Sequence, residues 1–129
     1  MLAIDTNVIV RLVVDDDREQ FVRANRMIAN HPVYVSNTVL LECEWVLRSA
    51  YGLEPSDFVE AVRDFAGLPN VTLEDPELAA TALDWHEKGM DFADALHLGR
   101  ADGYEAFVSF DKGLAKAAAK LGAVKVRAP

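Results

Sequence analysis

Short apolar segments alternate with longer amphipathic segments along the whole chain, and this alternation restricts the folds that the chain can adopt. The strand-like segments are 2–4, 33–35, 71–73, 106–109 and the VKV segment at 124–126. The segments of helical length are 6–14, 18–30, 36–50, 55–65, 76–87, 91–102 and 112–121. Strands separated by helices of this length form βαβ units with a mainly parallel sheet. We therefore expect an α/β domain of three layers, α/β/α, with a central sheet covered on both faces.

The length and composition fit one domain spanning 1–129. The chain has 129 residues, of which 51% are hydrophobic, enough for one substantial core. No apolar run reaches the roughly 18 residues of a membrane span, and no basic region precedes the apolar start, so no signal peptide is expected. Cys43 is the only cysteine. It is expected to be a small core residue, it excludes an internal disulfide, and it fits a reducing cytoplasm.

The net charge of −8 alone argues against a nucleic-acid-binding protein, because such proteins usually carry a basic surface. However, acids gathered around a metal ion are not free surface charge. The basic residues are also unevenly distributed. Lys112, Lys116 and Lys120 recur every four residues, so a helix would present them as one stripe. This stripe fits either a solvated helix face or a contact with phosphates.

Two acids are predicted at the carboxyl ends of strands, where ligands bind in open α/β sheets. Asp5 directly follows the strand at 2–4, and Asp111 comes two residues after the strand at 106–109. Either residue could instead serve only as a turn residue or a helix N-cap. Because the carboxyl ends of parallel strands meet at one edge, we expect these two acids to lie at the same edge of the sheet.

Further acids fall within helices that are otherwise apolar. Glu42 interrupts a hydrophobic stripe, although periodicity does not separate it cleanly from Glu44, which has similar apolar neighbours. Asp91 and Asp94 lie one turn apart, and Asp94 is the more interior because Asp91 could be an N-cap. Glu42 could also be an ordinary helix acid, and Asp94 could simply complement the helix dipole. Taken singly, none of these acids identifies a site.

Taken together, the four acidic motifs resemble a known family. Their order is Asp in IDTNVIV, Glu in VLLECEWVL, Asp in DFADALHL and Asp in FVSFD. The pattern is similar to that of the PIN-domain ribonucleases, and most similar to the VapC toxins of bacterial toxin–antitoxin pairs. The resemblance covers the whole chain. It implies that the chain is one PIN domain and a ribonuclease.

The resemblance implies a site, position by position. Its acidic quartet corresponds to Asp5, Glu42, Asp94 and Asp111, which would act as catalytic residues and metal ligands. Supporting polar positions correspond to Thr6, Asn7 and Ser109. Many relatives have a second Asp and an aromatic residue after the last motif, whereas this chain continues as DKGLAK. Asp91 is therefore a further candidate ligand.

A carboxylate quartet suits phosphodiester hydrolysis, because hard divalent cations prefer oxygen ligands and activate water. We therefore expect Mg²⁺ or Mn²⁺ as cofactor and RNA as substrate. Candidate contacts to the RNA backbone are Arg11, Lys112 and Lys116. The resemblance further implies cleavage that leaves a 5′-phosphate and a 3′-hydroxyl, a cognate antitoxin, and a toxin homodimer.

Two other classes of function fit some of these residues. In a haloacid-dehalogenase-like phosphatase, Asp5 would be a nucleophile, but that family requires an Asp two residues later, where Asn7 stands. A non-catalytic, receiver-like binding module would also gather acids at strand ends. Glu42 within a helix does not suit the receiver arrangement. A binding module predicts no metal-dependent stabilisation and no activity lost on changing Asp5.

Overall fold

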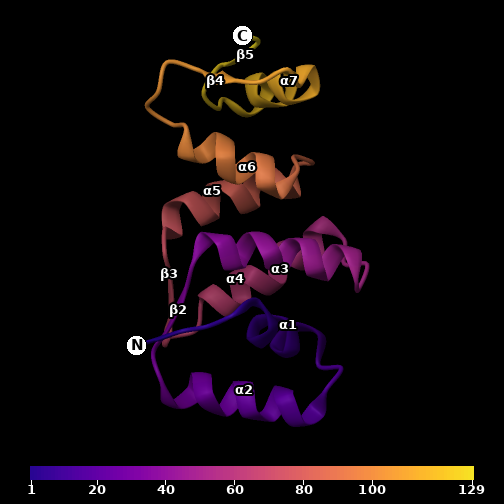
Figure 1. Cartoon of the computed structure of the whole chain (residues 1–129), viewed down its shortest axis with the longest axis vertical. Coiled ribbons are helices and arrows are strands. Elements are labelled where there is room, and N and C mark those ends of the chain that lie inside the picture. The colour runs from indigo at the N-terminus through magenta and orange to yellow at the C-terminus, as the bar shows by residue number, and fades with distance from the viewer. The chain divides into compact units, whose positions relative to one another are not determined.

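The computed structural model describes residues 1–129, and their contacts divide them into two compact units, Met1–Pro76 and Glu77–Pro129. Each unit is described by itself (Figure 1). The first contains β1 (Leu2–Ala3), α1 (Thr6–Val14), α2 (Arg18–Asn30), β2 (Val33–Val35), α3 (Asn37–Ser49), α4 (Pro55–Ala66) and β3 (Val71–Leu73). The second is built from α5 (Pro76–Glu87), of which only the first residue belongs to the first unit, and from α6 (Phe92–Arg100), β4 (Phe107–Val108), α7 (Lys112–Leu121) and β5 (Val126–Arg127).

In the first unit, three strands form a parallel sheet in the order β1-β2-β3. The register pairs Leu2 with Val33 and Val33 with Val71. Two helices connect each pair of consecutive strands, as parallel strands require a crossover. Helix α1 packs between α2 and α3, and α4 packs against β3 (Figure 1). The core of this unit is aliphatic and aromatic, and its fully buried members include Ile9, Val33, Val35, Leu40, Leu47 and Val59.

The second unit contains a parallel pair, β4 and β5, connected by α7. Helix α7 lies beside this pair in Figure 1. It ends at Gly122, whose φ of +69° is the left-handed conformation that glycine adopts without strain. Gly99 of α6 permits a close approach to α5, because a Cβ there would lie 2.6 Å from Leu78 Cδ1. None of the helices in the chain has the length and hydropathy of a membrane span.

The predicted α/β class with parallel strands is confirmed, and most element boundaries agree within one or two residues. The strand predicted at 2–4 ends at Ala3, although Ile4 N still donates to Tyr34 O at 3.2 Å. The helix predicted at 91–102 ends at Arg100, because the chain turns after it at Ala101. The last strand begins at Val126 instead of 124, where Phe107 N donates to Lys125 O and sets its pairing with β4. The prediction of a single domain over 1–129 stays a prediction.

Candidate functional site

Asp5 stands between β1 and α1, as the sequence predicted for an acid at the carboxyl end of a strand. It is the N-cap of α1, and its Oδ1 accepts a hydrogen bond from Thr6 N at 2.7 Å. The residue is exposed, while the preceding Ile4 and the following Thr6 are buried. The cap explains the turn but leaves the exposed side of the carboxylate open to a ligand. Asn would cap the helix equally well, so the cap alone does not require a charge.

Thr6 connects the first acid to the second. Its Oγ1 donates a hydrogen bond to Glu42 Oε1 at 2.5 Å, although the two residues are 36 positions apart. Thr6 itself is only 5% exposed, so the position of its hydroxyl is fixed by packing. Thr6 therefore orients the carboxylate of Glu42, and its supporting role in catalysis stays a prediction.

Asp5 and Glu42 line one pocket of about 340 Å³ at the junction of α1 and α3. The rest of its lining consists of Thr6, Asn7, Val10, Arg11, Val46, Ala50 and Tyr51. Burial first, and then the charges of Glu42 and Asp5, raise the pKa of the neighbouring Cys43 thiol to about 12. The thiol is fully buried, as predicted for a core residue. The structure therefore brings the first two members of the predicted quartet together.

The structure also distinguishes Glu42 from Glu44, which periodicity left ambiguous. Glu44 is only 4% exposed, and its Oε2 accepts from Arg48 Nε at 2.9 Å along the same helix. Glu42 is exposed on the surface that faces α1, where Thr6 holds it. Glu44 is thus engaged in an ion pair within α3, whereas Glu42 presents its carboxylate to the pocket.

Arg11 and Tyr51, which line this pocket, belong to a polar network that the sequence did not reveal. Tyr51 Oη donates to Asp16 Oδ2 at 2.8 Å, and Arg11 Nη1 contacts both Asp16 Oδ1 at 3.1 Å and Tyr51 Oη at 3.3 Å. Arg11 Nε donates to Gln20 Oε1 at 2.6 Å. The bond to Tyr51 and the charge of Asp16 raise the pKa of Arg11. The guanidinium of Arg11 is thereby held at the edge of the pocket that contains the carboxylates of Asp5 and Glu42.

The other two predicted acids belong to the second unit, in which they lie close to each other. The expectation that Asp5 and Asp111 lie at the edge of one sheet is wrong, because Asp5 follows β1 and Asp111 follows β4, and these strands belong to different sheets. Burial first, and then the charges of Asp91 and Asp111, raise the pKa of Asp94, whereas nearby His97 lowers it. Asp91 Oδ2 accepts from Asp94 N at 3.1 Å, so Asp91 is the N-cap of α6. The charges of Asp91 and Asp111 therefore both act on Asp94 in the first turn of α6.

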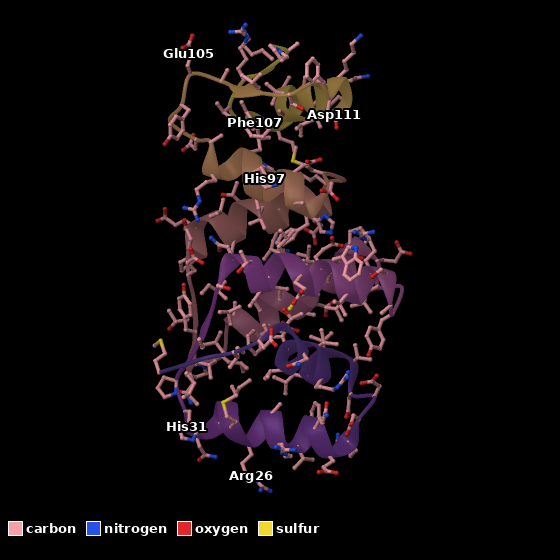
Figure 2. All side chains as sticks on the ribbon, in the orientation of Figure 1. Arg26, His31, His97, Glu105, Phe107 and Asp111 are labelled. Atoms are coloured by element: carbon pink, nitrogen blue, oxygen red, sulfur yellow. The ribbon has the colours of Figure 1, made fainter.

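Asp111 has the N-cap role that the sequence left open, and its role as a metal ligand stays a prediction. It is the N-cap of α7, with Oδ1 accepting from Leu114 N at 2.9 Å, and it is exposed at the start of that helix (Figure 2). Ser109 Oγ accepts from Asp111 N at 3.0 Å, so Ser109 fixes the backbone of this last acid. Lys112 and Lys116 are exposed on α7, as predicted, and their contact with RNA stays a prediction.

The donor set of these residues fits a hard divalent cation. The candidate residues offer carboxylate and hydroxyl oxygens, and no thiolate is available because Cys43 keeps its proton at neutral pH. Within either unit, no three His, Cys, Asp or Glu side chains are already close enough to form a complete metal site. The metal-ligand role of Asp5, Glu42, Asp94, Asp111 and Asp91 therefore stays a prediction.

The comparisons with known proteins identify the family. The model of the PIN domain matches residues 2–120, so the chain belongs to the PIN-domain family, as its acidic motifs predicted. Among solved structures, it is similar to the VapC20 toxin of Mycobacterium tuberculosis, which is described as cleaving the sarcin–ricin loop. The two share 25% identity over 98% of this chain and 99% of that chain, with a TM-score of 0.45. No curated protein matches the chain.

Proposed function

We propose that this chain is a Mg²⁺- or Mn²⁺-dependent endoribonuclease that hydrolyses RNA phosphodiesters through Asp5, Glu42, Asp94 and Asp111. The observation that carries the proposal is the pocket between α1 and α3, where Thr6 holds Glu42 beside Asp5. Membership of the PIN-domain family supports it. Family membership also favours a nuclease over the phosphatase and the receiver-like module, and no feature of the pocket favours either of those.

The residues of the pocket would have different roles in catalysis. The bound metal would supply a polarised water and neutralise charge at the scissile phosphate. Asp5 and Glu42 would hold it, with Thr6 fixing the carboxylate of Glu42. Asn7 and Arg11 line the same pocket and would donate hydrogen bonds to phosphate oxygens. In the second unit, Ser109 positions the backbone of Asp111.

The electrostatics of the acids support the need for a cation. Two carboxylates about 5 Å apart repel by roughly 3 kcal/mol at an effective dielectric constant of 20. Burial is the larger cause of the raised pKa of Asp94, and the further rise caused by the charges of Asp91 and Asp111 is the expected response of a carboxyl group to such repulsion. A divalent cation would relieve this repulsion, which also reconciles a net charge of −8 with an RNA substrate.

The biological role that we propose is that of a cytoplasmic toxin, inhibited by a cognate antitoxin and active as a homodimer. The resemblance of the four acidic motifs to the VapC toxins supports this role. The most direct test of this role is to inspect the reading frame next to the gene for this chain. A small upstream antitoxin-like gene supports the role, and its absence would favour a PIN nuclease without a partner.

Two measurements on the purified chain test metal dependence. RNA should be cleaved in Mn²⁺ or Mg²⁺ and left intact in EDTA, with 5′-phosphate ends on the products. The same cations should raise the melting temperature, because only the folded chain holds the acids in fixed positions. Cleavage that is unaffected by EDTA would overturn metal dependence, and the absence of cleavage on every RNA tested would overturn the function.

A further inference from the structure

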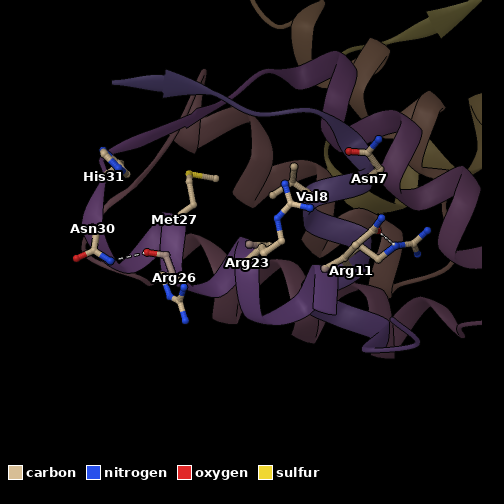
Figure 3. Close-up of a pocket in the computed structure, with 10 residues that line it drawn as sticks. Asn7, Val8, Arg11, Arg23, Arg26, Met27, Asn30 and His31 are labelled. Atoms are coloured by element: carbon tan, nitrogen blue, oxygen red, sulfur yellow. Dashed lines mark hydrogen bonds between the residues drawn. The ribbon is translucent and has the colours of Figure 1, made fainter. Parts of the chain in front are cut away.

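A second and larger pocket, of about 730 Å³, lies between α1 and α2. We call it the α1–α2 groove, and Figure 3 shows it in close-up. Its lining consists of Asn7, Val8, Arg11, Gln20, Arg23, Ala24, Arg26, Met27, Asn30 and His31. None of the catalytic acids proposed above belongs to this lining.

The charge of the α1–α2 groove is opposite to that of the protein. The chain has 21 Asp and Glu residues against 13 Lys and Arg, yet the lining contains three arginines, one histidine and no acid. Arg11 is engaged by Asp16 and Tyr51. Arg23 is exposed and makes no hydrogen bond or ion pair within the chain. The groove therefore has the charge to bind an anion.

The groove adjoins the pocket that holds Asp5 and Glu42. Asn7 and Arg11 line both of them. A chain of phosphates with one member beside Asp5 would therefore have its neighbouring members directed past Arg11 toward Arg23. A polyanion can occupy both pockets at once, whereas a single small anion would fill only one.

The floor of the groove is apolar. Val8, Ala24 and Met27 line it and are neither fully buried nor fully exposed. In Figure 3, Met27 and Arg23 extend from α2 on the side of Val8, whereas the guanidinium of Arg26 points away. A nucleobase or ribose can rest on such a floor while a guanidinium contacts the adjoining phosphate.

We propose that the α1–α2 groove binds single-stranded RNA on the nucleotides next to the cleavage site, with Arg23 contacting a phosphate. The proposal rests on the ribonuclease function proposed above and deepens it by assigning a substrate subsite outside the acidic pocket. The occupant is the sugar–phosphate backbone of RNA, because the groove shares residues with the pocket where a phosphate would be hydrolysed.

The direct test is the binding of a fluorescent single-stranded RNA of about 12 nucleotides, measured by anisotropy in EDTA, which prevents metal-dependent cleavage. Arg23→Gln should weaken binding about 5- to 10-fold and reduce the salt slope by about 0.7. Arg18→Gln is the matched control. It removes the same charge from the same helix, but Arg18 lies outside the groove, paired with Asp15 at 2.8 Å and placed over the ring of Phe21.

A kinetic test separates binding in the groove from chemistry in the acidic pocket. On a long RNA, Arg23→Gln should raise KM with little change in kcat, because the lost contact is the same in ground and transition states. On a dinucleotide that reaches only the acidic pocket, the variant and the wild type should cleave equally. Both Arg18 and Arg23 are exposed, and melting curves verify that each variant folds.

Three outcomes would overturn the subsite. Arg23→Gln binds the RNA as tightly as wild type, or Arg18→Gln weakens binding equally, or Arg23→Gln loses affinity for an acidic peptide but not for RNA. The last outcome would assign the groove to an acidic protein partner. Failure of the proposed ribonuclease function would give a different result. The wild type would then cleave no RNA, whereas its RNA binding in EDTA could still be measured.

Discussion

Thr6 Oγ1 donates a hydrogen bond to Glu42 Oε1 at 2.5 Å, which ties the first turn of α1 to the middle of α3. The bond joins residues 36 positions apart at the wall of the pocket that also contains Asp5. A hydroxyl that is buried on one side and donates to an exposed carboxylate fixes that carboxylate in a single orientation. The first two acids of the site are therefore preorganised before any ligand binds.

Thr6→Val tests this orientation, because valine keeps the shape of threonine and removes the donor. We expect cleavage to fall about 10- to 100-fold, as when a residue orienting a metal ligand is removed, with a loss of at most about 1.5 kcal/mol in unfolding free energy. Thr6→Ser is the matched control and should retain most activity. Equal activity of the valine and serine variants would show that Glu42 does not depend on this bond.

Glu42 and Glu44 should respond in opposite ways to substitution. Glu42→Gln should abolish cleavage and leave the melting temperature nearly unchanged, because its carboxylate is exposed in the pocket. Glu44→Ala should lower the unfolding free energy by about 1–3 kcal/mol, because it removes the buried partner of Arg48. Its activity per folded molecule should remain. Loss of cleavage by a folded Glu44→Ala variant, with cleavage retained by Glu42→Gln, would assign the catalytic role to Glu44 instead of Glu42.

Asp91 and Asp111 both cap helices, so a metal-ligand role can be tested only by a substitution that keeps the helix cap. Asn caps as well as Asp, whereas Ala removes about 1 kcal/mol of cap stabilisation. We expect Asp111→Asn to lose cleavage at an unchanged melting temperature, and Asp91→Asn to retain most of it. Activity assays with thermal melts measure both. The opposite pattern would make Asp91 the ligand and Asp111 a cap alone.

Cys43 should be inert in the folded protein. Burial, with Glu42 and Asp5 nearby, raises the pKa of its thiol to about 12, compared with about 8.5 in an unfolded chain. A thiol reagent at about pH 8 should modify it only on unfolding. The raised pKa also means that this group's stabilising contribution, complete below about pH 8.5, declines as pH rises toward 12. The unfolding free energy of Cys43→Ala should therefore fall less than that of the wild type as pH rises above about 8.5. Rapid modification of the native protein would contradict this placement.

The sequence predicted those features that depend on local chemistry. Ser36 caps α3 and Pro55 begins α4, as their residue types indicated. Asp5 was identified because a charge followed an apolar strand, and topology alone assigned it to the edge of the sheet. These features need only neighbouring residues or the direction of a strand, and the printed sequence contains both.

Features that depend on tertiary contacts could not be predicted. Glu42 and Glu44 have similar apolar neighbours along α3, and only the contact with Thr6 separates them. Tyr51 lines the pocket through partners 35 and 40 positions away, and no local pattern marks it. The α1–α2 groove likewise arises from the packing of two helices whose basic residues are interspersed with others in the sequence.

The most direct measurement is Mn²⁺-dependent RNA cleavage by Asp5→Asn beside the wild type. Asn keeps an oxygen that can accept from Thr6 N, so the cap of α1 and the fold should survive, as circular dichroism and melting curves can verify. We predict that cleavage falls by about 100-fold or more and that Mn²⁺ no longer raises the melting temperature as it does for the wild type. Wild-type cleavage by a folded Asp5→Asn variant would contradict the acidic site.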